Sequence, residues 1–176
     1  MPRSSPLPER RPAIVAGASA GIGEATAIEL ASRGFPVALG ARRVEKLDDL
    51  VGKIRADGGE AVGFHLDVTD PTSVKSFVSQ SVNALGEIEV LVAGAGDTYF
   101  GKLAEITTDE FDSQLQIHLV GANRLATAVL PGMLARQRGD LIFVGPGCTI
   151  DARTPVPSSS IWKFVTMATS AALAAP

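Results

Sequence analysis

One short stretch near the N-terminus limits the possible folds more than any other part of the chain. Residues 15–23 read V-A-G-A-S-A-G-I-G, so an apolar strand ends at Ala16 and three glycines lead into a helix. Glycine suits a turn in which φ is positive or the backbone must approach a ligand closely. The first turn of the helix then offers N–H groups and the positive end of its dipole to a pyrophosphate. A tight turn without a ligand is the alternative, but it rarely needs three glycines. The candidate phosphate-binding residues are Gly17, Ser19, Gly21, Ile22 and Gly23.

Strand-like and helix-like segments alternate along the rest of the chain. Apolar runs predict strands over residues 13–16, 37–40, 61–66, 88–93 and 141–144. Helical periodicity and end signals predict helices over residues 22–33, 44–54, 71–85, 107–137 and 159–174. This alternation predicts a Rossmann-like α/β fold, which is a doubly wound parallel sheet of about five strands with helices on both faces. A ligand is then expected at the carboxyl ends of the strands.

The size and composition of the chain fit one ordinary globular domain. Of its 176 residues, 45% are hydrophobic and 20% are charged. We expect residues 13–176 to form this domain, after a polar, disordered arm over residues 1–12. The net charge of −3 gives no reason to expect nucleic acid or an anionic membrane as a partner. The single cysteine, Cys148, predicts no internal disulfide and a reducing, cytoplasmic setting. We expect no metal site and no membrane span.

Two arginines follow the second predicted strand, in the sequence G-A-R-R over residues 40–43. An NAD site of this fold usually has an acidic residue near this point, which accepts hydrogen bonds from the ribose hydroxyls. Here the first acidic residue is Glu45, and the guanidinium of Arg42 or Arg43 can instead pair with a 2′-phosphate. Arginines at a helix start are also common as solvated charges. The pair therefore favours NADP(H) over NAD(H) without excluding NAD(H).

Two further strand ends carry residues that suit a dinucleotide. Asp67 follows the third strand, and its carboxylate can accept the adenine amino group while the N–H of Val68 bonds a ring nitrogen. Small residues end the fourth strand and let the backbone pass beside the nicotinamide ribose. These residues are Ala93, Gly94, Ala95 and Gly96. Both places could be ordinary turns, but two glycine-containing turns on neighbouring strands fit one elongated ligand better.

The chain resembles the short-chain dehydrogenase/reductase family over residues 13–144, with weaker similarity beyond. The stretch A-G-A-S-A-G-I-G over residues 16–23 is similar to the family's T-G-x-x-x-G-I-G. L-D-V-T over residues 66–69 resembles its adenine-contact motif, and V-A-G-A-G over residues 92–96 resembles V-N-N-A-G with both asparagines lost. The resemblance implies reversible hydride transfer between NADP(H) and an alcohol or carbonyl substrate. It also implies assembly as a homodimer or homotetramer.

Most catalytic residues that the resemblance implies are replaced. The family uses a tyrosine as acid and base, a lysine four residues later, a serine that polarises the substrate oxygen and an asparagine that holds a relay water. In a gap-free alignment these fall on Ser159, Lys163, Pro146 and His118. Lys163 is therefore expected to hold the nicotinamide ribose, and Ser159 and His118 are the candidate proton-transfer residues. A structural role is the more common one for a lone histidine on a helix.

Three hypotheses for the activity stay open. In the first, the chain is an active reductase in which Ser159, Tyr99 or His118 replaces the missing acid. In the second, it is a catalytically silent NADP(H)-binding protein or truncated product that acts through a partner. In the third, it does not hold the fold, because family members usually continue through two more strands and a substrate-binding segment. From about residue 146, the tail is either the family's catalytic helix without its tyrosine or an unrelated sequence. The sequence does not identify the substrate.

Overall fold

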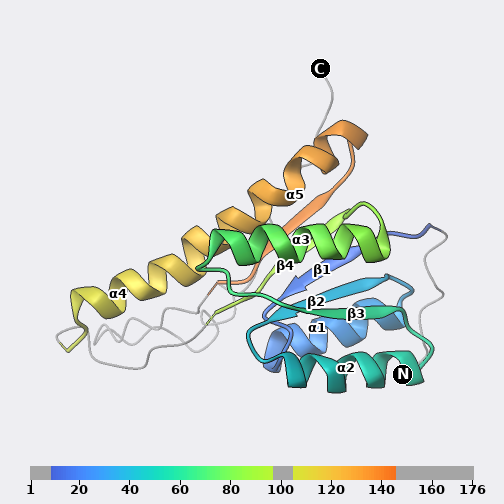
Figure 1. Ribbon diagram of the computed structural model, residues 1–176, viewed down its shortest axis with the longest axis horizontal. Coiled ribbons are helices and arrows are strands. Elements are labelled where there is room, and N and C mark those ends of the chain that lie inside the picture. Colours follow the sequence, from blue (N-terminus) through green and yellow to red (C-terminus); the bar gives the residue numbers. More distant parts are fainter. Residues whose placement is uncertain (1–8, 97–104, 146–176) are drawn as a thin grey trace, which may run out of the picture.

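The computed structural model describes residues 9–96 and 105–145 and shows a parallel sheet between two layers of helices (Figure 1). The strands are β1 (Ala13–Ala16), β2 (Val37–Ala41), β3 (Ala61–His65), β4 (Val90–Ala93) and β5 (Asp140–Phe143). The helical elements are α1 (Gly21–Ser32), α2 (Val44–Ala56), α3 (Pro71–Leu85), α4 (Thr108–Leu115), the π-helical η1 (Gln116–Gly121) and α5 (Ala122–Arg136). None of these helices is long and apolar enough to cross a membrane. The strand order β3-β2-β1-β4-β5, with all pairs parallel, confirms the predicted doubly wound fold.

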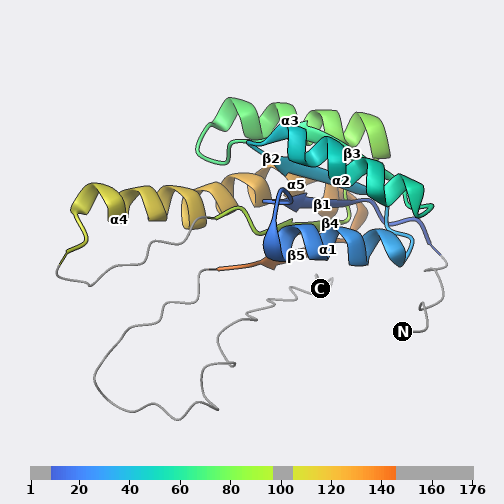
Figure 2. The same cartoon turned by 90° about the horizontal axis from the view of Figure 1, so that it is seen from below.

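The central strand β1 separates the two halves of the core. Side chains alternate along a strand, so Ala13 and Val15 face one side of the sheet while Ile14 and Ala16 face the other. The first pair belongs to the core under α1 and α2, and the second to the core under α3 and α5 (Figures 1 and 2). All four residues are fully buried. A strand that is covered on both faces has to be apolar throughout, which explains the A-I-V-A sequence of β1.

The helix ends agree with the sequence wherever it carries a specific end signal. Asp70 caps α3 by accepting a 2.8 Å hydrogen bond from the N–H of Thr72, and Pro71 occupies the first helical position. Thr107 and Glu110 form a capping box at the start of α4. These signals act between residues that are close in the sequence, so they can be recognised without knowing the tertiary structure.

The helix that the sequence predicted over residues 107–137 is divided by the π-helical segment η1. α4 ends at Leu115, and α5 begins only at Ala122. Each π-turn holds an extra residue, which redirects the side chains that it carries. At the end of η1, Gly121 packs so closely on the β3–α3 loop that a β-carbon would lie 2.7 Å from Cγ2 of Val68. The π-helical segment thus ends where the helix crosses a distant loop. The predicted helix over residues 159–174 lies outside the described residues.

Residues 9–12, which the sequence analysis assigned to a disordered arm, make specific contacts with the sheet. The carbonyl of Pro12 accepts hydrogen bonds from the N–H groups of Glu89 (2.9 Å) and Val90 (3.2 Å). Arg11 forms ion pairs with Glu89 and Asp140 at the amino ends of β4 and β5. The partners are far away in the sequence, so the polar, proline-rich composition of the arm did not indicate these contacts. Residues 1–8 lie outside the described residues.

We expect the ion pairs around Glu89 to contribute measurably to stability. Oε2 of Glu89 lies 3.1 Å from Nε of Arg11 and 2.9 Å from Nε of Arg138, and its side chain is only 14% exposed. Glu89→Gln leaves both guanidinium groups with a weaker partner and should lower the free energy of unfolding by about 1–3 kcal/mol. Glu29→Gln, which breaks the exposed pair with Arg33 in α1, should cost less than about 0.5 kcal/mol. Urea denaturation measures the free energy of unfolding of both variants. Equal losses would contradict the expectation that the less exposed ion pairs of Glu89 contribute more to stability.

Candidate functional site

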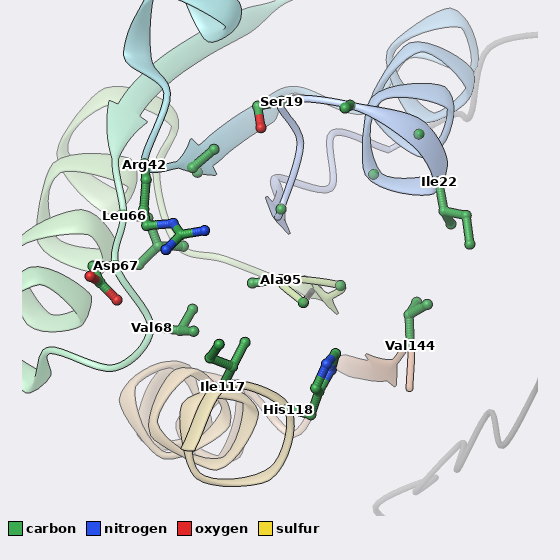
Figure 3. A pocket seen from close by; sticks show the side chains of 18 of the residues that line it. Ser19, Ile22, Arg42, Leu66, Asp67, Val68, Ala95, Ile117, His118 and Val144 are labelled. Atoms are coloured by element: carbon green, nitrogen blue, oxygen red, sulfur yellow. The ribbon is translucent and has the colours of Figure 1, made fainter. Parts of the chain in front are cut away.

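A cavity of about 710 Å³ opens at the carboxyl ends of the strands (Figure 3). It lies at the point where the chain passes from β1 to strands on either side, which is where doubly wound sheets bind their ligands. The turns after β1, β2, β3 and β4 contribute to it, together with η1 and the end of β5. The lining residues are 17, 19–23, 40–43, 66–69, 94–96, 117, 118, 144 and 145.

The turn at Gly17 packs directly against the turn that follows β4. Gly17 has a φ of +82°, and a β-carbon there would lie 2.5 Å from the carbonyl oxygen of Gly94 and 2.8 Å from the nitrogen of Ala95. The N–H of Gly94 donates to the carbonyl of Ala16 at 3.1 Å. The first glycine of the motif is therefore needed for two reasons: its φ is positive, and its backbone lies too close to the turn after β4 for a side chain to fit.

The remainder of this turn leads into α1 without side-chain capping. Gly21 has a φ of +62°, and a β-carbon on Gly23 would collide with the carbonyl oxygen of Gly17. Ala20 occupies the N-cap position and forms no side-chain hydrogen bond to the helix. Ile22 stands at the rim of the cavity and is 64% exposed. The N–H groups of the first turn are thus placed where an anionic ligand can accept hydrogen bonds from them.

Arg42 and Arg43 occupy different positions at the cavity. Arg43 reaches back across the glycine turn, where its Nη2 and Nε donate to Oγ of Ser19 at 2.8 and 3.2 Å. The side chain of Arg42 points into the cavity, and its charge acts on Asp67 (Figure 3). The two cations give this end of the cavity a local positive charge, which suits an anionic group.

The turn that contains Asp67 holds its side chain as a carboxylate. Oδ1 accepts hydrogen bonds from the hydroxyl of Thr69 at 2.7 Å and from its N–H at 2.9 Å. These hydrogen bonds, the hydroxyl first, lower the pKa of Asp67 below its ordinary value. Partial burial opposes the shift, while the charges of Arg42 and His65 add to it. The turn therefore presents a fixed hydrogen-bond acceptor at the cavity.

We expect Thr69→Val to raise the pKa of Asp67 toward its ordinary value, because the variant lacks the hydroxyl donor. A lowered pKa stabilises the folded state above the unfolded-state pKa, and this contribution is lost as the pH falls through the folded-state pKa. The variant should thus be less stable than the wild type at neutral pH, and the difference should vanish in acid. NMR titration of the carboxyl groups measures the pKa of Asp67, and denaturation at neutral and at acid pH measures the difference in stability. Thr26→Val, which removes a hydroxyl bonded to Ile22 within α1, should leave the pKa of Asp67 unchanged. An unchanged pKa in Thr69→Val would contradict the assigned cause.

The loop with Asp67 is also fixed to the helical layer, by a residue that the sequence analysis missed. The carbonyl of the buried Val68 accepts a 3.1 Å hydrogen bond from Nη1 of Arg124 in α5. No local pattern marks Arg124, because its partner lies 56 positions away in the sequence. Thr69 was missed as well, although it belongs to the L-D-V-T motif and was therefore recognisable.

His118 reaches the cavity from η1, opposite the glycine turn. Its ring packs against Gly96, where a β-carbon would lie 2.8 Å from Nδ1. In Figure 3, His118 and Ile117 point toward Ala95, and Val144, which follows β5, lies beside His118. The sequence analysis missed Ile117 and Val144, since their positions depend on the π-helical segment and on the last strand. The structure thus brings His118 together with the turn after β4.

Some predicted site residues are not found at the cavity. Ala93 is the last residue of β4, where it is buried and its carbonyl accepts a 3.0 Å hydrogen bond from the N–H of Val144. Ala93 therefore takes part in the pairing of β4 with the chain at the end of β5, and it does not line the cavity. Tyr99, Pro146, Ser159 and Lys163 lie outside the described residues. Within residues 9–96 and 105–145, no group of three or more His, Cys, Asp or Glu side chains is arranged to hold a metal ion.

The fold and the position of the cavity define a doubly wound α/β protein of the nucleotide-binding type. A family model described as short chain dehydrogenase matches residues 11–161. The chain therefore belongs to the short-chain dehydrogenase family.

Individual relatives agree with this assignment. The chain is 38% identical to glycine betaine reductase ATRR of Emericella nidulans over 144 residues, which are 80% of this chain and 11% of that protein. It is also 38% identical to an uncharacterized oxidoreductase of Listeria innocua, over 73% of this chain and 52% of the relative. A solved alcohol dehydrogenase from the archaeon Thermococcus sibiricus, complexed with 5-hydroxy-NADP, has a TM-score of 0.70 and 36% identity, over 74% of this chain and 56% of its own. The chain thus spans about half the length of two of these proteins and a much smaller part of the first.

Proposed function

We propose that the chain is an oxidoreductase of the short-chain type that transfers a hydride between NADP(H) and an alcohol or carbonyl substrate. The observation that carries this proposal is the single cavity onto which the glycine turn, Arg42, the Asp67 turn and His118 converge. The likeness to the Thermococcus sibiricus alcohol dehydrogenase, which was solved with 5-hydroxy-NADP, supports the cofactor class.

The residues at the cavity fit such a dinucleotide. The backbone at Gly17 and Gly23 excludes side chains and leaves the first turn of α1 for the pyrophosphate. The fixed carboxylate of Asp67 suits the adenine amino group, and the guanidinium groups of Arg42 and Arg43 suit a 2′-phosphate. When bound, the cofactor supplies or accepts the hydride at its nicotinamide ring. The proposed cofactor-binding residues are Gly17, Ser19, Gly21, Ile22, Gly23, Arg42, Arg43, Asp67, Val68, Gly94, Ala95, Gly96 and Lys163.

Proton transfer to or from the substrate oxygen requires an ionisable side chain near the turn after β4. His118 is a described residue at the cavity that suits this task, because it packs against Gly96 and an imidazole ring can donate or accept a proton. The hydroxyl of Ser159 could donate a hydrogen bond, but serine does not ionise near neutral pH. The ammonium group of Lys163 would hold the nicotinamide ribose.

NADP(H) binding without turnover is a second candidate function. It is favoured by Ser159 and Pro146, which stand where the family has its tyrosine and its polarising serine. Proline offers neither a hydroxyl nor an N–H to a developing oxyanion, so transition-state stabilisation would be weak. A silent protein would act through binding to a partner.

A titration with NADPH, with NADH in parallel, tests the cofactor assignment. Fluorescence of Trp162 or of NADPH itself follows the binding, and we expect saturation with the tighter affinity for NADPH. Lack of binding by either dinucleotide would contradict the proposal. Oxidation of NADPH with a panel of carbonyl compounds then distinguishes the two candidate functions. If the chain is active through His118, His118→Ala should lose turnover but keep binding, whereas Ser159→Tyr should change turnover little.

We further propose that the protein works in the cytoplasm as a homodimer or homotetramer. Apolar side chains along α4 and η1 support assembly through this segment, since Phe111 is 56%, Leu115 38% and Leu119 65% exposed. Sedimentation of the wild type and of Leu119→Lys measures the oligomeric state, and a monomeric wild type would contradict the assembly.

A further inference from the structure

Strand β5 buries less of its surface than the strands beside it. Within the described residues it pairs only with β4, at the edge of the sheet (Figure 2). Its residues are half-buried or exposed, whereas those of β1 and β4 are all buried. The chain that leaves β5 nevertheless forms part of the cavity wall, because Val144 and Gly145 line the cavity. The position of this wall therefore depends on the contacts that hold β5 in the sheet.

The segment before β1 makes such contacts at the amino edge of the sheet. Nη2 of Arg11 lies 2.6 Å from Oδ2 of Asp140, the first residue of β5, and its Nε lies 3.1 Å from Oε2 of Glu89. The side chains of Arg11 and Glu89 are only 23% and 14% exposed, so water screens their attraction less than that of a surface pair. Oε2 of Glu9 lies 2.6 Å from Nη2 of Arg138, in the turn that enters β5. The segment thus holds the start of β5 from outside the sheet.

The neighbouring Arg10 binds the other half of the molecule. Its Nη1 donates to the carbonyl of Leu85 at the end of α3. Its Nη2 lies 2.6 Å from Oε1 of Glu60, which directly precedes β3. Two adjacent arginines of one segment therefore reach opposite edges of the sheet, and Arg10 makes no printed contact with β5.

We propose that Arg11 is a positioning residue, which holds β5 against β4 and thereby fixes Val144 at the wall of the cavity. The N–H of Asp140 donates to the carbonyl of Glu89 at 2.8 Å, and the N–H of Val144 donates to that of Ala93 at 3.0 Å. Arg11 binds the side chains of Glu89 and Asp140, the same two residues that form the first of these backbone hydrogen bonds. Edge strands open locally from their ends, so a second link between these residues opposes the opening of β5.

Hydrogen exchange of single backbone amides on the full chain tests this role. We expect Arg11→Ala to speed exchange of the N–H groups of Asp140 and Val144 about tenfold. The N–H of Leu66, next to β3 at the other edge of the sheet, is the internal reference and should change less than about twofold. Arg10→Ala is the matched control, because it removes an arginine from the same segment, and it should leave exchange at Asp140 and Val144 within about twofold of the wild type.

Charge reversal tests the effect on the cavity. Arg11→Glu places a third carboxylate beside two others, so β5 should be released for a large part of the time, and a ligand that needs the wall loses affinity in proportion. Val144 lies beside His118, near the place proposed for nicotinamide (Figure 3). We therefore expect Arg11→Glu to weaken NADPH binding at least about threefold, and binding of adenosine 2′,5′-bisphosphate, which lacks nicotinamide, less than about twofold. Arg10→Glu should change neither affinity. This readout alone rests on the proposed function.

The outcomes that overturn the inference differ from those that overturn the proposed function. Wild-type exchange at Asp140 and Val144 in Arg11→Ala would overturn the positioning role, and so would equal acceleration in Arg10→Ala. Acceleration that includes Leu66 to the same degree would show a general loss of stability instead. Wild-type NADPH affinity in Arg11→Glu would overturn the link between β5 and the cavity. If the wild type binds neither NADPH nor NADH, the proposed function fails, while exchange at Val144 still decides whether Arg11 fixes this residue.

Discussion

Gly17→Ala should abolish saturable NADPH binding and lower the free energy of unfolding by about 2–5 kcal/mol. The new β-carbon would face the carbonyl oxygen of Gly94 at 2.5 Å, with φ at +82°, where side chains are rarely tolerated. A backbone carbonyl cannot rotate away as a flexible side chain can, so the turns after β1 and β4 would have to separate. Urea denaturation and an NADPH titration measure the two effects.

A glycine elsewhere in the domain provides the matched control. Gly52 lies in α2, where a β-carbon would meet no atom within 4 Å. Gly52→Ala should raise the free energy of unfolding by about 0.5–1 kcal/mol, since alanine loses less conformational entropy in a helix. It should leave NADPH binding unchanged. Wild-type NADPH affinity in Gly17→Ala would contradict the assignment of this turn to the cofactor.

Arg42→Ala should weaken NADPH binding by about 10–100-fold and change NADH binding by less than about twofold. The guanidinium points into the cavity, and charge-assisted hydrogen bonds to a phosphate contribute about 1.5–3 kcal/mol. The same variant should raise the pKa of Asp67 somewhat, because the charge of Arg42 helps to lower it. Titrations at two salt concentrations and carboxyl NMR measure these effects. Equal losses of NADPH and NADH affinity would instead indicate a general disturbance of the cavity.

The parts of the fold that could be predicted depend on residues close together in the sequence. The apolar run of β1 and the cap of Asp70 on α3 are local signals, and both elements are found where the sequence placed them. The π-helical segment η1 has no local sequence signal, and its close contact at Gly121 is with the distant loop of Val68. The contacts of residues 9–12 could not be predicted either, since the carbonyl of Pro12 is hydrogen-bonded to residues at the distant start of β4.

The candidate site was predictable as far as it is built from strand ends. In a parallel sheet all carboxyl ends meet at one edge, so Gly17, Arg42 and Asp67 could be grouped from sequence alone. Ala93 was included as one of the small residues that end β4, but it is buried by strand pairing and does not line the cavity. The helical layer also contributes to the site, since Ile117 lines the cavity and Arg124 donates a hydrogen bond to the loop of Val68. These contributions could not be predicted, because they depend on where each side chain points in the folded protein.

The central place of β1 has a consequence for how the chain assembles during synthesis. Ala13 pairs with Val37 on one side and with Val90 on the other, so one edge of β1 can form long before its second partner is made. At ordinary ribosomal speeds, the wait between β2 and β4 is on the order of several seconds. During this time an apolar strand edge is open to pairing with other chains. Aggregation is therefore expected to compete with folding mainly while β1 is paired with β2 but not yet with β4. A chaperone that covers the open edge of β1 would act at this stage.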